Sequence, residues 1–198
     1  MKRVQKQEPA PRVLLVVTGG IAAYKACDVV RELRRGGCAV QVVLTREATQ
    51  FVTPLAFEAL SGRRALVELL PGVTEGVIDH IRLGRDCDVA AVAPATANFL
   101  AKLWAGLADD LASATLLALP RAVPLLLAPA MNGEMWAHPA TSRNLRELAA
   151  LHGRKLEILA PVQKELACGE IGQGGLPEPA TVAAAIVRHA QLKSAAPA

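Results

Sequence analysis

Three short stretches carry the polar groups best suited to bind a ligand. Each follows an apolar run that predicts a buried strand, and they span residues 18–21, 93–98 and 128–136. The last of them contains an amide side chain, Asn132, in a turn that begins near Pro129 and leads into an expected helix. Because open α/β sheets bind ligands at the carboxyl ends of their strands, we expect the three stretches to form one site.

The first stretch is suited to an anion. Gly19 and Gly20 join an expected strand to an expected helix, and a helix N-terminus offers unpaired N–H groups and a positive dipole end. The spacing is neither G-x-G-x-x-G nor a P-loop, so a mononucleotide phosphate is favoured over a dinucleotide or a nucleoside triphosphate. A tight turn that needs glycine only for its geometry is an equal alternative. Thr45, which ends the second expected strand, could donate to the same phosphate, although an ordinary helix cap is the simpler interpretation.

The other two stretches offer uncharged donors. Thr96 and Asn98 could hydrogen-bond a ligand ring, with helix capping by Thr96 as the alternative. The amide of Asn132 could hold a carboxylate without neutralising it. Met131 and Met135 are expected to pack rather than react.

Two further residues could move protons. His80 could act as a base near neutral pH, but a single histidine in an expected loop is more often structural. Cys168 lies in the glycine-rich segment 167–179, which suggests a flap that brings the thiol to a ligand when it closes. A surface thiol in a loop is the alternative.

Composition excludes several other classes. The net charge is +4, but the basic residues are dispersed, so we expect no nucleic-acid partner. No apolar run reaches the length of about 18 residues that a membrane span requires, and we expect a cytoplasmic protein with no membrane partner. The four cysteines form no C-x-x-C pair, which disfavours zinc and disulfides. Asp109 and Asp110 are adjacent, and neighbours on a helix point about 100° apart, so we expect no metal there.

Strands alternate with helices along the chain. This order predicts an α/β fold with a single doubly wound parallel sheet, Rossmann-like and flavodoxin-like, and helices on both faces. Strands are expected at 12–18, 39–44, 89–93, 124–128 and 156–160, and helices at 22–35, 51–60, 98–119, 139–152 and 181–192. Residues 62–80 are expected to be a loop with a short strand. We expect a flexible N-terminus at 1–11, one domain over 12–192 and a disordered tail at 193–198.

Taken together, the motifs are similar to those of a known family. The chain resembles the flavin-containing cysteine decarboxylases over about residues 12–179. The motifs that carry the resemblance are GGIAAYK (19–25), FVTPL (51–55), DHI (79–81), APATAN (93–98), ADDL (108–111), PAMNGEMW (129–136) and ACGE (167–170). The pattern P-x-M-N-x-x-M-W is highly specific to this family.

The resemblance implies FMN as the cofactor. It places the FMN phosphate near Gly19, Gly20 and Thr45, with Ile21 and Phe51 as further contacts. The flavin ring is expected against four more residues, namely Thr96, Ala97, Asn98 and Ala130.

It also implies a redox-neutral decarboxylation in coenzyme A biosynthesis, with phosphopantothenoylcysteine as the small-molecule substrate. The substrate thiol is oxidised to a thioaldehyde, with His80 assisting as a base. CO2 then leaves to give an enethiol, which is reduced to the thiol product with Cys168 as proton donor. Asn132 holds the carboxylate and Met135 packs beside it. No nicotinamide is needed.

Members of the family form homotrimers or homododecamers with FMN at the subunit interface, so His80 is expected to serve a flavin bound mainly by a neighbouring chain. Bacterial relatives often carry a phosphopantothenate–cysteine ligase domain after this one. Two interpretations stay open, namely that the ligase is a separate protein here or that this chain is a monofunctional relative. Many of them have a basic residue and Met where this chain has Gly175 and Leu176. This difference leaves the substrate range open.

Three alternatives follow from the same resemblance. Some relatives oxidatively decarboxylate the C-terminal cysteine of a peptide and stop at the enethiol, which does not require Cys168. Others are flavin-binding regulatory subunits without catalysis, but these carry long acidic extensions. Flavin prenyltransferases share the fold but lack the P-x-M-N pattern.

Overall fold

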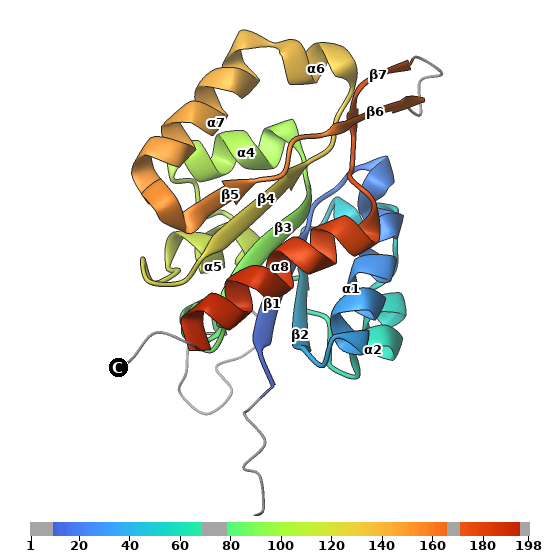
Figure 1. Cartoon of the computed structure of the whole chain (residues 1–198), viewed down its shortest axis with the longest axis vertical. Helices are drawn as coiled ribbons and strands as arrows, with labels where there is room; N and C mark the ends of the chain where they lie inside the picture. Colours follow the sequence, from blue (N-terminus) through green and yellow to red (C-terminus); the bar gives the residue numbers. More distant parts are fainter. Residues whose placement is uncertain (1–9, 69–78, 166–170, 195–198) are drawn as a thin grey trace, which may run out of the picture.

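The central sheet has five parallel strands. The computed structural model describes residues 10–68, 79–165 and 171–194. Its strands are β1 (Arg12–Val17), β2 (Ala39–Leu44), β3 (Val89–Ala95), β4 (Leu125–Pro129) and β5 (Leu156–Ile158), arranged in the order β2-β1-β3-β4-β5 (Figure 1). Every expected strand is confirmed to within two residues at either end. The order is that of a flavodoxin-like doubly wound sheet.

Helices connect the strands. They are α1 (Lys25–Arg35), α2 (Pro54–Ser61), α3 (Asp79–Arg85), α4 (Ala97–Ala105), α5 (Leu111–Leu117), α6 (Gly133–Ala137), α7 (Pro139–His152) and α8 (Pro179–Ser194). Three short 3-10 helices are η1 (Ile21–Tyr24), η2 (Ala48–Gln50) and η3 (Gly153–Lys155). None of the described helices is both long and apolar enough to cross a lipid bilayer.

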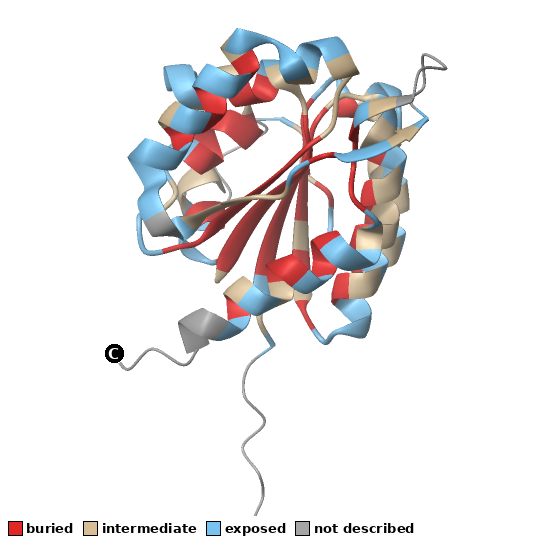
Figure 2. Cartoon of the chain, turned by 45° about the horizontal axis from the view of Figure 1, so that its top comes forward, coloured by how far each residue is buried: buried red, intermediate tan, exposed pale blue. Residues whose placement is uncertain are grey.

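One hydrophobic core lies on each face of the sheet. In β1, Val13, Leu15 and Val17 pack with α1, α2 and α8, whereas Leu14 and Val16 pack on the opposite side with α3, α4, α5 and α7 (Figure 1). The inner strands β1, β3 and β4 are therefore buried on both faces, whereas β5 at the edge is only half-buried (Figure 2). This burial explains why the sequences of the inner strands are continuous aliphatic runs rather than alternating patterns.

The strand order reverses between β1 and β3. These neighbouring strands are in register from Val13↔Val89 to Val16↔Val92. The chain leaves β1 toward β2 on one side, and leaves β3 toward β4 on the other. A crevice therefore opens at their carboxyl ends, and it is there that doubly wound sheets place their ligand sites.

The glycine-rich segment differs from its prediction. Residues 167–179 were expected to form a loop, but the described part contains β7 (Ile171–Gly175), which pairs antiparallel with β6 (Val162–Glu165). Glycine weakens a strand pattern, but it is retained where another backbone approaches closely. A Cβ on Gly174 would lie 2.1 Å from Met131 O, so the close approach explains the glycine.

Two other predictions need correction. His80 was placed in a loop, but it lies in the first turn of α3. Within 62–68, the expected short strand is a single parallel bridge between Leu66 and Val43. Three expected segments lie wholly or partly outside the described residues. They are residues 69–78 of the expected loop, residues 1–9 of the expected N-terminal segment and residues 195–198 of the expected tail.

Candidate functional site

A pocket of about 830 Å³ opens at the carboxyl ends of the strands, and all three predicted stretches contribute to it. The predicted site residues that line it are Gly19, Gly20, Ile21, Thr45, Thr96, Ala97, Asn98, Ala130, Asn132 and Met135. Phe51 and His80 do not line it, and Cys168 lies outside the described residues. The sheet therefore gathers ten of the thirteen predicted residues into one cavity.

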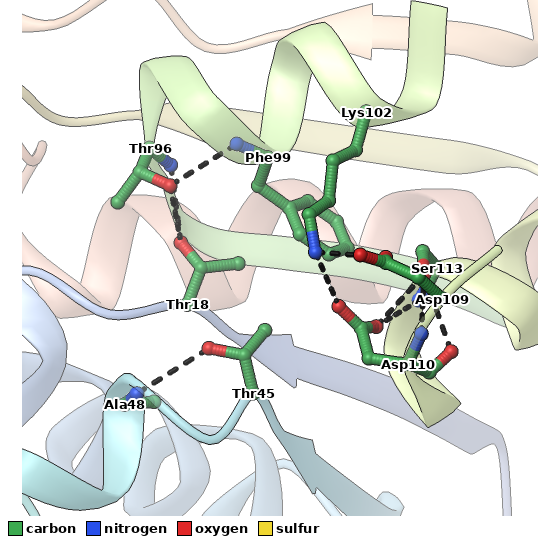
Figure 3. A network of polar contacts seen from close by, with 9 residues as sticks. All are labelled: Thr18, Thr45, Ala48, Thr96, Phe99, Lys102, Asp109, Asp110 and Ser113. Atoms are coloured by element: carbon green, nitrogen blue, oxygen red, sulfur yellow. Dashed lines mark hydrogen bonds and ion pairs between the residues drawn. The ribbon is translucent and has the colours of Figure 1, made fainter. Parts of the chain in front are cut away.

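Thr18 joins the ends of β1 and β3. Its buried hydroxyl donates to Pro94 O at 2.7 Å. It also accepts from the Thr96 backbone N–H at 3.0 Å (Figure 3). These bonds tie together the two strand ends that flank the crevice. We had not singled out Thr18, although a hydroxyl that ends an aliphatic strand at the ligand edge is a signal that could have identified it.

Thr96 and Thr45 both line the pocket. The Thr96 hydroxyl accepts from Phe99 N at 3.3 Å and caps α4, which confirms the capping alternative for this residue. The Thr45 hydroxyl accepts from Ala48 N at 3.3 Å, but the N-cap residue of η2 is Glu47, so Thr45 is not the helix cap that was expected. Each bond holds its threonine side chain in place at the wall of the pocket (Figure 3).

The glycine turn brings β1 close to the segment after β2. A Cβ on Gly19 would lie 2.3 Å from the Cβ of Glu47, which no side chain can tolerate without a shift. A Cβ on Gly20 would instead make a tight contact of 3.4 Å with Thr96 Cγ2. The backbone N–H groups at the start of η1 are thereby left accessible from the pocket, as anion binding requires.

The turn after β4 is fixed by backbone bonds. Ala130 N donates to Ala95 O at 3.1 Å, and Met131 N donates to Gly174 O of β7 at 2.9 Å. Asn132 then caps α6, because its Oδ1 accepts from Glu134 N at 2.8 Å. This bond fixes the amide oxygen as an acceptor, so the amide nitrogen is the group that can donate to a carboxylate in the pocket.

A charged network closes one wall. Lys102 Nζ contacts Asp109 Oδ1 at 2.8 Å and Asp110 Oδ2 at 3.0 Å (Figure 3). The hydrogen bond that Lys102 donates to Asp109 raises the pKa of Lys102, and the same bond lowers the pKa of Asp109. Asp110 also forms a capping box with Ser113 at the start of α5. Both carboxylates are thus engaged, and the described residues contain no group of three or more side chains that could hold a metal ion.

Two predicted residues lie away from the pocket. His80 is half-buried on α3, which packs against α5. Phe51 lies between η2 and α2, and 48% of it is exposed to solvent. Within a single copy of the chain, neither side chain contributes to the pocket.

Fold and site together define a class. The chain is a flavodoxin-like α/β protein whose pocket, at the β1/β3 switch point, combines a glycine turn for an anion with hydroxyl and amide donors. The sequence profile of one family, Flavoprotein, matches residues 1–191. The chain belongs to the Flavoprotein family.

Curated relatives share a name in coenzyme A metabolism. The coenzyme A biosynthesis bifunctional protein CoaBC of Mycolicibacterium smegmatis is 46% identical over 84% of this chain and 39% of its own length. The protein of the same name from Vibrio vulnificus is 40% identical over 92% of this chain and 44% of its own length. The chain thus spans less than half the length of these relatives.

Solved structures support the same family. A cysteine-to-serine mutant of PPC decarboxylase, complexed with pantothenoylaminoethenethiol, superposes with a TM-score of 0.79 at 32% identity, covering 91% of this chain and 97% of that one. The FMN binding protein AtHal3 gives 0.78 at 31% identity, covering 96% and 100%. The FMN-dependent cysteine decarboxylase SpaF gives 0.73 at 31% identity, covering 91% and 97%. These matches confirm the predicted fold and the resemblance to cysteine decarboxylases.

Proposed function

We propose that this chain is a cytoplasmic, FMN-dependent decarboxylase that converts 4′-phosphopantothenoylcysteine to 4′-phosphopantetheine in coenzyme A biosynthesis. The observation that carries the proposal is the Asn132 turn, which places an amide in a pocket at the β1/β3 switch point. Its support is the likeness to PPC decarboxylase, which extends over nearly the whole of both chains.

The pocket fits FMN. Its volume of about 830 Å³ lies within the usual range for cofactor sites. Gly19, Gly20, Ile21 and Thr45 would hold the phosphate end, where a side chain at Gly19 would be excluded by Glu47. The residues that would contact the ring are Thr96, Ala97, Asn98 and Ala130. When bound there, FMN supplies a reversible two-electron oxidation of the substrate thiol.

The side chains of the chain orient the substrate and move its protons. The amide of Asn132 donates to the substrate carboxylate and leaves it anionic, as loss of CO2 requires. Met135, at the mouth of the pocket, packs beside the substrate. His80 accepts the thiol proton, and Cys168 returns a proton to carbon at the end. The substrate loses two electrons and two protons, then CO2, and regains two electrons and three protons. The third proton comes from solvent and replaces the lost carboxylate on carbon, so atoms and charge balance.

An oligomer of this chain would complete the active site. Ile21, Tyr24, Phe51 and Leu55 are large hydrophobic side chains that are 48–71% exposed in one copy of the chain. Exposed apolar side chains near a site favour burial against another copy. A homotrimer or homododecamer would cover them, and it would allow His80 of one subunit to serve the pocket of its neighbour. A phosphopantothenate–cysteine ligase would form the amide bond that joins cysteine to phosphopantothenate in the substrate.

The test is anaerobic incubation of the flavin-loaded protein with phosphopantothenoylcysteine, followed by mass spectrometry and the flavin spectrum. We expect loss of CO2 to give the saturated thiol, with the flavin oxidised at the end. Loss of CO2 with two further hydrogens missing and a reduced flavin would assign an oxidative decarboxylase instead. No loss of CO2 would overturn the proposal.

The role of Cys168 has its own test. In Cys168→Ser, the enethiol should accumulate, because the last proton is not delivered. The matched control is Cys27→Ser, on α1 outside the pocket, which should give the saturated thiol. Saturated product from the Cys168 variant would show that this proton comes from another group.

A further inference from the structure

Two lysines of the pocket, Lys25 and Lys164, form no ion pair within the described part of the chain. Lys25 begins α1 and Lys164 lies in β6, and both line the cavity. In the parts of the chain that the structure describes, neither forms an ion pair, in contrast to Lys102, which contacts two aspartates. Lys164 Nζ donates to the carbonyl oxygen of Leu176 at 3.0 Å, which holds the ammonium group at the rim of the pocket.

The two ammonium groups act on each other. Burial and the neighbouring Lys25 side chain both lower the pKa of Lys164, and only the more weakly acting Glu178 opposes them. Two like charges side by side in a partly desolvated cavity are unfavourable until an anion lies between them. The local charge is therefore matched to an anionic ligand group.

Gly175 permits this arrangement. A Cβ on Gly175 would lie 2.2 Å from Lys164 Cε and 2.7 Å from its Cγ. The stem of Lys164 thus crosses β7 at Gly175, where any side chain would collide with it. Position 175 is also where many bacterial members of the resembled family have a basic residue and this chain has glycine. Lys164 of β6 places a positive charge at this wall of the pocket instead.

We propose that Lys25 and Lys164 bind the phosphate monoester of the substrate, and that Lys164 takes over the role of a basic residue at position 175. The inference rests on the proposed function and adds the residues that select a phosphorylated substrate. The phosphate of FMN is the other phosphate monoester that enters this pocket, but the glycine turn at Gly19 and Gly20 already offers it backbone donors. Two ammonium groups suit a dianion by charge-assisted hydrogen bonds.

The experiment measures binding and does not require turnover. The affinities of 4′-phosphopantetheine and of pantetheine for the FMN-loaded protein are compared by calorimetry. Loss of one charged hydrogen bond corresponds to about 10-fold to 100-fold in affinity, so Lys164→Met and Lys25→Met should each weaken the phosphorylated ligand by that factor and leave pantetheine unchanged. The control is Lys155→Met, an exposed lysine outside the pocket, which should keep the wild-type ratio.

A second variant relocates the charge. In Lys164→Gly combined with Gly175→Lys, the stem no longer collides, and the preference for the phosphorylated ligand should return. Equal weakening of both ligands in Lys164→Met would indicate a structural role and overturn the inference. The lysine variants could instead retain FMN less well than riboflavin and still prefer the phosphorylated ligand. That result would assign Lys25 and Lys164 to the phosphate of FMN, and it would also overturn the inference. A protein that prefers the phosphorylated ligand but releases no CO2 would contradict the proposed function alone.

Discussion

Met131 and Gly174 are joined backbone to backbone. Met131 N donates to Gly174 O at 2.9 Å, and a Cβ on Gly174 would lie only 2.1 Å from Met131 O. The β6–β7 hairpin is therefore attached to the turn that positions Asn132, one residue further on. Because of this contact, the hairpin can influence the position of the Asn132 side chain, although it comes about 30 residues later in the chain.

Gly174→Ala should separate the hairpin from the turn. Overpacking of this kind costs about 1–3 kcal/mol, and we expect a loss of stability of that size in urea unfolding, together with a raised KM. Gly133→Ala is the matched control, because its Cβ would meet Gln173 O at an ordinary 3.8 Å. Equal stability and KM in the two variants would show that the close approach has no consequence.

Thr18→Val should weaken the link between β1 and β3. Valine keeps the shape but leaves Pro94 O and Thr96 N, both at the crevice, without their partner. Leaving such buried groups unsatisfied costs about 1–3 kcal/mol, measurable by urea unfolding, and flavin retention should fall as the walls of the crevice loosen. Thr18→Ser keeps the hydroxyl and should retain most of both properties. A valine variant as stable as the serine variant would contradict this explanation.

The sequence was most informative where a local pattern determines the structure. The strands of the sheet are aliphatic runs that end at glycine, proline or threonine, and their boundaries were predicted closely. Thr96 was recognised as a cap because capping depends on neighbours in the chain. The convergence of Thr45 and Thr96 on one pocket followed from the parallel order of the strands alone.

The parts that were missed depend on long-range contacts. The β7 strand is rich in glycine because of what lies opposite it, namely Met131 O and the stem of Lys164, and neither is near it in sequence. For the same reason Lys164 had no recognisable role before its path across Gly175 was seen. The motif around His80 identifies a residue type, but no local pattern tells which pocket that side chain serves.

Acid should weaken the contact between β5 and α8 through Glu157. Burial raises the pKa of Glu157, but hydrogen bonds from Arg188 and His189 outweigh it, so the pKa is lowered overall. A lowered pKa in the folded state means that the stabilisation is present above the unfolded value of about 4.3 and is lost as the pH falls below it.

Glu157→Gln should therefore lower the Tm near pH 6, with the difference from wild type shrinking toward pH 3. Calorimetric scans between these values provide the measurement. Glu68→Gln, at an exposed glutamate without an ion pair among the described residues, should follow the wild-type profile. Parallel profiles for wild type and Glu157→Gln down to pH 3 would contradict the assignment.

His80→Asn should abolish turnover while FMN remains bound, because His80 lies outside the pocket of its own chain. If the site is shared between subunits, an inactive His80→Asn chain still offers an intact Asn132 pocket, and an inactive Asn132→Ala chain still offers an intact His80. When the His80→Asn chain and the Asn132→Ala chain are co-expressed, or mixed and reassembled, the mixed oligomers should regain activity in a fraction of their sites. Two chains that both carry His80→Asn and Asn132→Ala should regain none. If the mixture stays inactive although mass spectrometry detects mixed oligomers, His80 acts within its own chain or not at all.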